Sequence, residues 1–97
     1  MDTTAHIATA AIATADLTVL AIRGAEYVDA ETFARAETLL GQVCEAQRVI
    51  HDDIDFDDVT DAEFEQIDGY RLAADRAFQT IARARVRILD EQAAPAL

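Results

Sequence analysis

Hydrophobic residues recur every three or four positions along three long stretches of the chain, which is the spacing of one face of an α-helix. The stretches lie at about 4–23, 30–50 and 61–92, with an acidic connection at about 51–60 and a short C-terminal tail. The pattern predicts an all-α fold in which residues 1–97 form one domain, a compact bundle of three main helices. Because the connections are short, neighbouring helices are expected to run antiparallel.

The first stretch is apolar nearly all round, unlike the one-sided pattern of a surface helix. Its hydrophobic positions include Ile7, Ala11, Ile12, Ala15, Val19 and Ile22. Such a helix either lies inside a monomer or also faces a second subunit, and burial inside the monomer is the interpretation we favour. A membrane span is not expected, because the stretch carries Asp16 and a charged side chain at the bilayer centre costs about 3 kcal/mol.

The second stretch has the signals of an amphipathic helix. Asp29 is placed to cap its N-terminus, and Glu31 lies in the first turn, where negative charge is favourable. The apolar stripe expected to face the core contains Phe33, Ala36, Leu40, Val43, Gln47 and Ile50.

The third stretch has the clearest start signal in the chain. Thr60 and Glu63 have the spacing of a capping box, in which each side chain hydrogen-bonds the backbone of the other residue. The helix is therefore expected to begin near Asp61. Its inward positions then alternate by three and four, at Phe64, Ile67, Arg71, Ala74, Phe78, Ile81, Arg85 and Ile88.

Two of these inward positions hold arginine, which leaves two interpretations open. The aliphatic stems can pack on the core while the guanidinium groups reach solvent. Alternatively, Arg71, Phe78 and Arg85 form part of a seam with a second copy of the chain, as in a homodimer.

Two glycines bear on the packing of the second and third helices. Gly41 and Gly69 lie equally far from Asp55, so a hairpin centred there would bring them to one level and predicts a close approach of the helices. Gly69 has an alternative role as a break that divides the third helix into a short and a long part.

The composition excludes several classes of enzyme. The chain has no Ser and no Lys, so it offers no serine nucleophile, Schiff-base lysine or P-loop lysine. Acidic residues are plentiful, but the segment that holds most of them is predicted to be exposed rather than to line a pocket. With a single cysteine, Cys44, no internal disulfide can form, and a reducing, cytoplasmic location is expected. We expect a protein that is not an enzyme.

Charge is unevenly distributed along the chain. The formal net charge is −11, and residues 49–70 contain nine carboxylates and no Arg or Lys. Residues 71–89, in contrast, contain five arginines and one aspartate. The net acidity argues against direct binding to nucleic acid or to anionic membranes.

The acidic connection resembles the calcium loop of an EF-hand, because Asp53, Asp55 and Asp57 alternate between two helices. Asp58 occupies the position that needs glycine for a sharp turn, and Glu63 closes the loop one residue early. One missing residue rotates that carboxylate by about 100° on its helix. A degenerate calcium binder is kept as an alternative, and no cofactor or metal is expected.

Recognition by a protein partner is the interpretation we favour for the acidic segment. In an extended chain, Asp53, Asp55 and Asp57 would project on one side at intervals of about 6.6 Å, comparable to phosphates along one nucleic-acid strand. Such a row fits a groove lined by Lys and Arg. In charge and size alone, the chain resembles small acidic helical proteins of phage and mobile elements, such as DNA mimics that inhibit CRISPR complexes.

The sequence therefore predicts a small acidic binding protein, an inhibitor or adaptor that engages a basic surface of a protein partner. The alternative is a homo-oligomeric structural or assembly protein. Phe56, a large apolar residue among the acids, is expected either in the core or as an exposed anchor. The expected contact residues are Asp52, Asp53, Asp55, Phe56, Asp57 and Asp58, extended along the third helix by Asp61, Glu63 and Glu65.

Overall fold

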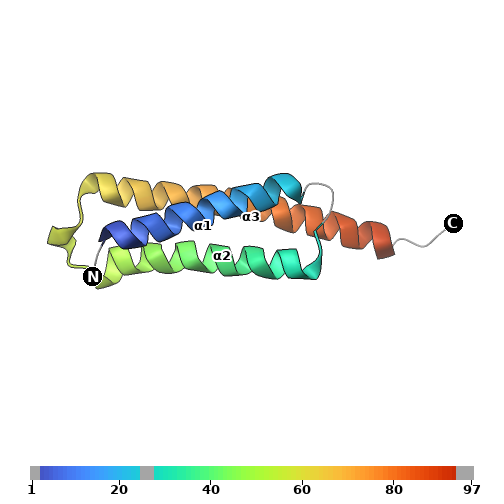
Figure 1. Cartoon of the computed structure of the whole chain (residues 1–97), viewed down its shortest axis with the longest axis horizontal. Helices are drawn as coiled ribbons and strands as arrows, with labels where there is room; N and C mark the ends of the chain where they lie inside the picture. Colours follow the sequence, from blue (N-terminus) through green and yellow to red (C-terminus); the bar gives the residue numbers. More distant parts are fainter. Residues whose placement is uncertain (1–2, 25–27, 94–97) are drawn as a thin grey trace.

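The computed structural model describes residues 3–24 and 28–93, and within these ranges it contains helices and no strand. Three long helices, α1 (Thr3–Arg23), α2 (Ala30–Arg48) and α3 (Asp61–Ala93), pack side by side (Figure 1). A π-helical turn, η1 (Val49–Asp53), extends α2, and a short 3-10 turn, η2 (Phe56–Asp58), precedes α3. The all-α bundle predicted from the periodicity is confirmed.

Helix α2 runs in the opposite direction to α1 and α3, as the colours in Figure 1 show. The contacts agree, because Gln47 near the end of α2 hydrogen-bonds Asp68 and Arg71 near the start of α3. At the other end of the bundle, Val28 just before α2 contacts Arg85. The molecule is a rod of 63 × 19 × 16 Å, and the C-terminal part of α3 projects beyond the other two helices (Figure 1).

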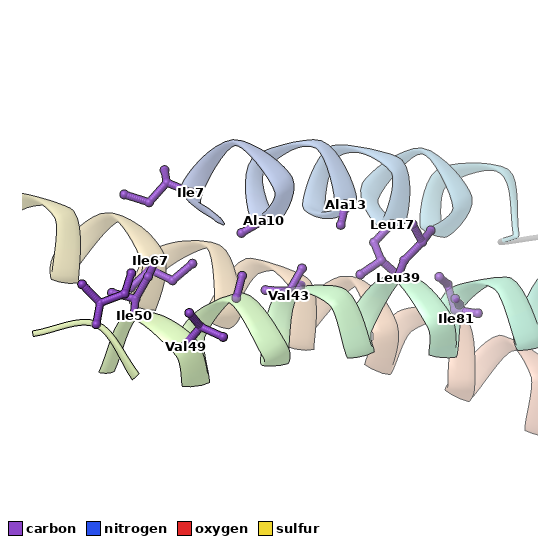
Figure 2. Close-up of a cluster of buried hydrophobic side chains, with 14 of the residues drawn as sticks. Ile7, Ala10, Ala13, Leu17, Leu39, Val43, Val49, Ile50, Ile67 and Ile81 are labelled. Atoms are coloured by element: carbon purple, nitrogen blue, oxygen red, sulfur yellow. The ribbon is translucent and has the colours of Figure 1, made fainter. Parts of the chain in front are cut away.

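The core is a narrow column of side chains along the axis of the rod (Figure 2). Leu17, Ile50, Ile67 and Ile81 are its largest fully buried members. Many of the remaining positions are alanines, which let helix axes approach toward the lower end of the usual 8–10 Å range. The buried alanines are Ala10, Ala13, Ala36, Ala46, Ala74 and Ala84.

Both predicted helix starts are confirmed at the level of single hydrogen bonds. The side chain of Asp29 accepts from the backbone N–H of Thr32 at 2.7 Å. At the start of α3, the hydroxyl of Thr60 accepts from the N–H of Glu63 at 3.2 Å, and Glu63 accepts in return from the N–H of Thr60 at 3.0 Å. These bonds satisfy N–H groups that a helix N-terminus otherwise leaves without partners.

The predictions for the two glycines are wrong. Helix α3 continues through Gly69 without a break. Gly41 and Gly69 are both exposed, and a Cβ atom added at either would meet no atom within 4 Å. The small residues that do lie buried between the helices are alanines.

The expectation that α1 is buried inside the monomer is wrong for its outer face. Ile12 is 65% exposed and Ile22 is 73% exposed, because only one side of α1 contacts α2 and α3.

By length and composition, α1 is the one helix among the described residues that could cross a membrane. The mean hydropathy of its most apolar 18-residue window is 1.6, and 28% of that window is buried in the bundle.

Candidate functional site

The acidic segment lies at one end of the rod, where η1 and η2 connect α2 to α3 (Figure 1). The structure brings most of the predicted contact residues to this end. The exposed ones are Asp52, Asp53, Asp55, Asp57, Asp58, Asp61 and Glu65, while Glu63 is half-buried. The side chain of Phe56 lies outside the described part of the structure. We refer to these exposed carboxylates as the acidic end.

Hydrophobic anchors hold the acidic end at both sides. Ile54 precedes η2 and is 8% exposed, and Val59 follows it and is also 8% exposed. Between them, the N–H of Asp58 donates to the carbonyl oxygen of Asp55 at 2.8 Å, closing the 3-10 turn. Burial of the two flanking side chains thus fixes where the chain leaves and re-enters the bundle, and the aspartates between them face solvent.

The π turn at the end of α2 was not predicted. The N–H of Ile54 donates to the carbonyl oxygen of Val49 at 2.9 Å, a bond to the fifth preceding residue. This wider turn places residues five apart on one side, so the guanidinium group of Arg48 reaches Asp53 at 3.0 Å as well as Glu45 at 2.6 Å. The hydrogen bond from Arg48 lowers the pKa of Glu45, and the same two carboxylates raise the pKa of Arg48.

The predicted extended row of Asp53, Asp55 and Asp57 is wrong. Asp53 belongs to the π turn and Asp57 to the 3-10 turn, so the three residues do not form one extended strand. The reason is local: both turns satisfy backbone groups that an isolated extended segment would leave to water. The acidic end is therefore a cluster on consecutive turns and not a linear ladder.

The resemblance to a calcium loop does not extend to the arrangement of the side chains. Glu63, the closing residue of that resemblance, accepts hydrogen bonds from both the N–H and the hydroxyl of Thr60. Among the described residues, no three His, Cys, Asp or Glu side chains converge as a metal site would require. The geometry therefore offers no support for the calcium alternative.

A polar network beside the acidic end was missed by sequence reasoning. One oxygen of Asp68 accepts from the amide of Gln47 at 2.9 Å and contacts Nε2 of His51 at 2.8 Å. The hydrogen bond from Gln47, together with that from His51, lowers the pKa of Asp68. The ring of His51 also stacks on Phe64, with centroids 4.9 Å apart. The seventeen-residue separation of His51 and Asp68 gives no signal in the sequence.

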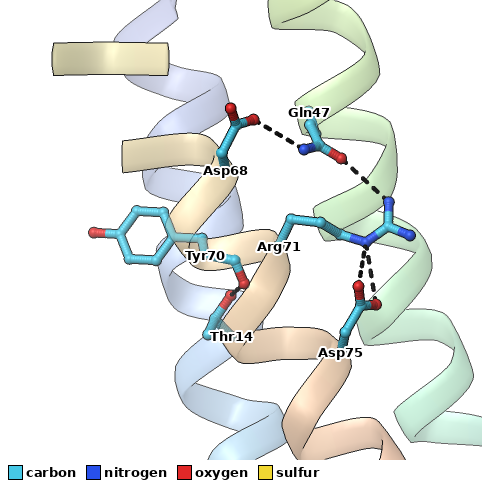
Figure 3. Close-up of polar contacts among 6 residues, drawn as sticks. All are labelled: Thr14, Gln47, Asp68, Tyr70, Arg71 and Asp75. Carbon is cyan, nitrogen blue, oxygen red and sulfur yellow. Dashed lines mark hydrogen bonds and ion pairs between the residues drawn. The ribbon is translucent and has the colours of Figure 1, made fainter. Parts of the chain in front are cut away.

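The residues of the predicted oligomer seam make contacts within the chain. Figure 3 shows Arg71 between Asp75, which accepts from its Nε at 3.1 Å, and the side-chain oxygen of Gln47 at 3.2 Å. The ring of Phe78 lies 5.6 Å from that of Phe33. Arg85 donates to the carbonyl oxygen of Val28 at 2.7 Å. All three residues thus face α2 or its N-terminal side.

Arginines gather toward the opposite half of the rod from the acidic end. Arg76, Arg83 and Arg87 lie on one side of α3, and Arg23 ends α1. Their negative counterparts in that half include Asp29 and Glu31 of the α2 N-terminus. The molecule therefore carries most of its excess negative charge at one end.

Two shallow grooves flank α1, and the described side chains that line them include no nucleophile in contact with a general base. The groove beside α3, of about 420 Å³, is lined by Thr, Ala and Ile side chains and by Arg76. The groove beside α2, of about 340 Å³, includes His6 and Glu45, but the carboxylate of Glu45 is already held by Arg48. Hydrolytic or transfer chemistry would need a nucleophile and base in mutual contact.

Comparisons of the chain with protein-family models, with curated protein sequences and with solved structures find no match.

Proposed function

We propose that this protein is a non-enzymatic binding protein, an inhibitor or adaptor that engages a basic surface of a protein partner through its acidic end. The observation that carries the proposal is the excess of exposed carboxylates there. Asp52, Asp57 and Asp58 are exposed, and no described side chain donates a hydrogen bond to them. Within the described part of the chain, the arginine that reaches the segment is Arg48, and it is shared between Asp53 and Glu45.

The physical basis is electrostatic complementarity. Carboxylates crowded on two turns repel one another, and a Lys- or Arg-lined surface relieves that repulsion on binding. Long-range attraction also accelerates the encounter, and the acceleration falls as salt is added. An acidic end anchored by the buried side chains of Ile54 and Val59 loses less conformational entropy on binding than a mobile acidic tail.

A nucleic-acid-binding protein is the partner class that fits the proposal best. Such proteins present clusters of Lys and Arg that hold phosphates. The acidic end would occupy that surface as a compact patch of negative charge. Binding of this kind is inhibition by occupancy and requires no turnover.

Capture from a lysate with matched variants tests the proposal. The test variant carries Asp52→Asn, Asp57→Asn and Asp58→Asn, which spares Asp53 and Asp55 because both have structural contacts. The control removes three charges elsewhere, with Asp16→Asn, Glu31→Gln and Glu37→Gln. The captured proteins are identified by mass spectrometry, and each is then produced and titrated directly.

The expected result is one partner with a basic surface that binds the wild-type chain and the control, and binds the test variant at least tenfold more weakly. Its affinity for the wild-type chain should fall by a similar factor when salt rises from 50 to 200 mM. Equal binding by all three chains, or binding insensitive to salt, would show that the acidic end is not the contact surface.

A further inference from the structure

The outer face of α1 carries a regular apolar stripe that no part of the described structure covers. The stripe comprises Ala5, Ala8, Ile12, Ala15, Val19 and Ile22. All six are exposed, and the three large side chains are 65%, 46% and 73% exposed for Ile12, Val19 and Ile22 respectively. The buried residues of the same helix, such as Leu17, lie on the opposite side.

The spacing of the stripe is that of a helix–helix seam. Its members are separated by three, four, three, four and three residues, which is the alternation of the two apolar positions in a heptad. The residues that flank the stripe are mostly uncharged: Thr4, Ala11 and Thr18 on one side, and Thr9, Asp16 and Arg23 on the other. A face built this way is suited to a second helix of similar polarity.

We propose that the stripe is the contact face of a homodimer in which α1 packs antiparallel against α1 of a second copy. With the two-fold axis midway between Ile12 and Ala15, every layer joins one alanine to one β-branched residue. Ala5 meets Ile22 of the second copy, and Ala8 meets Val19 of the second copy. At the centre, Ile12 meets Ala15 of the second copy. Alternation of large and small residues is what lets facing layers interdigitate.

A parallel pairing lacks this complementarity. It would place each residue opposite itself, so that Ala5 and Ala8 face alanines at one end, while Val19 faces valine and Ile22 faces isoleucine at the other. The small residues at the first end would leave space between the helices there, which opposes tight packing. The antiparallel pairing distributes volume evenly along the seam.

Charge selects the same orientation. The N-terminus of α1 lies at the acidic end of the rod (Figure 1), so a parallel dimer would bring two acidic ends together. The antiparallel dimer places them at opposite ends, well beyond the roughly 8 Å screening length at physiological salt. In the same register, Asp16 lies beside Thr9 of the second copy and not beside the other Asp16.

The available area predicts the strength of the dimer. A helix of 21 residues is about 31 Å long and about 10 Å wide, so the strip offers roughly 300 Å² on each copy. The total of roughly 600 Å² is below the 1,200–2,000 Å² of stable interfaces. The dimer should therefore be reversible and depend on concentration.

A lipid surface is the competing occupant of an apolar helix face. Amphipathic helices that bind membranes usually carry Lys or Arg on their polar side, which anionic headgroups attract. Here the flanks offer only Arg23, and the chain has a net charge of −11. Charge thus favours a second copy over a membrane.

Sedimentation equilibrium from 5 to 300 μM tests the dimer against the monomer mass of 10.6 kDa. The test variant carries Ile12→Glu and Ile22→Glu. The control carries Leu72→Glu and Val86→Glu on α3, which are 53% and 58% exposed and receive the same charge. Far-UV circular dichroism confirms that both variants remain folded.

The wild-type chain and the control should dimerise, and the test variant should remain monomeric with its dissociation constant raised at least thirtyfold. A wild-type chain that stays monomeric at 300 μM would overturn the proposal. Loss of the dimer in the control, alone or together with the test variant, would also overturn it. Flotation of the wild-type chain with neutral phosphatidylcholine vesicles, in place of dimerisation, would assign the stripe to lipid.

Disulfide trapping tests the orientation in a Cys44→Ala background. A chain with Ala8→Cys mixed with a chain with Val19→Cys should form the mixed disulfide. Neither chain alone should cross-link, because like cysteines would lie about 16 Å apart along the seam, whereas a disulfide needs Cα atoms within about 7 Å. Cross-linking of the Ala8→Cys chain to itself would establish the parallel pairing and overturn the antiparallel one.

The proposed dimer and the proposed binding function can be disproved separately, because each depends on different residues. The variant lacking Asp52, Asp57 and Asp58 carboxylates should dimerise at least as well as the wild-type chain, because net repulsion is reduced. The Ile12→Glu, Ile22→Glu variant retains the whole acidic end and should still capture the basic partner.

Discussion

The guanidinium group of Arg85 on α3 and the carbonyl oxygen of Val28, just before the N-cap of α2, are joined by a 2.7 Å hydrogen bond. Val28 itself is fully buried, so the bond ties the residue that precedes the N-cap of α2 to the far part of α3. A buried carbonyl without its donor would be costly.

Arg85→Ala should therefore lower the free energy of unfolding by about 1.5–3 kcal/mol, the range for hydrogen bonds to charged groups. Urea denaturation monitored by circular dichroism measures the change. Arg83→Ala is the matched control, because Arg83 is exposed on the same helix, and it should change stability by less than about 0.5 kcal/mol. Equal effects of the two substitutions would contradict the assignment.

Leu17→Ala tests whether the narrow core behaves as a packed interior. Leu17 is fully buried between the helices, and its truncation should cost about 2–5 kcal/mol through lost burial and the cavity left behind. Leu72→Ala, at a side chain 53% exposed, should cost far less. Thermal unfolding of both variants gives the comparison, and a small loss in the first would mean that the helices collapse onto the vacated space.

The capping box predicts effects of opposite sign for two threonines. Thr60→Ala removes the hydroxyl that accepts from the N–H of Glu63 and should destabilise the fold by about 1 kcal/mol. Thr80→Ala lies within α3 on its exposed side and should stabilise it by a few tenths of a kcal/mol, because alanine is the better helix former. The denaturant midpoints of the two variants are compared. A lower midpoint for Thr60→Ala alone indicates a loss of capping, whereas lower midpoints for both would indicate a general effect of removing a hydroxyl.

The network around Asp68 predicts a loss of stability in acid. Its pKa is lowered in the folded chain, so its carboxylate stabilises the fold above the unfolded pKa of about 3.9. That contribution is lost as the pH falls through the folded pKa. Because the side chain is 51% exposed, the effect should stay below about 1 kcal/mol.

Asp68→Asn measures that contribution. The variant should melt at a lower temperature than the wild-type chain at pH 7, and the difference should vanish at about pH 2. Glu65→Gln is the control, since Glu65 is exposed on the same helix and no described side chain donates to it. A difference that persists undiminished in acid would mean that Asp68 acts through packing and not through its charge.

The sequence predicted those features that depend on near neighbours. Helical periodicity located α2 and α3, and the caps at Asp29 and Thr60 follow from spacings of three residues. Features that depend on distant residues were not predictable. Arg71 reaches Gln47 and Arg85 reaches the carbonyl oxygen of Val28, both on other segments, and the sequence around the two arginines does not indicate these long-range bonds.

The candidate site shows the same division. Its acidity was evident from composition, but its shape was not, because the π turn depends on how Ile54 reaches the core from the end of α2. The outer face of α1 also misled the prediction. An apolar pattern all round a helix does not say which side its neighbours will cover, and here two helices were too few to enclose it.

The separation of charge along the rod makes the molecule an electric dipole whose long axis coincides with its shape. A basic surface at a distance exerts a torque on such a dipole and turns the acidic end toward itself before any contact forms. Pairing two copies head to tail would cancel the two dipoles, although each acidic end would remain exposed. A monomer would therefore approach a basic surface with its acidic end already turned toward it. A dimer, which has an acidic end at each extremity, would arrive in either of two equivalent orientations.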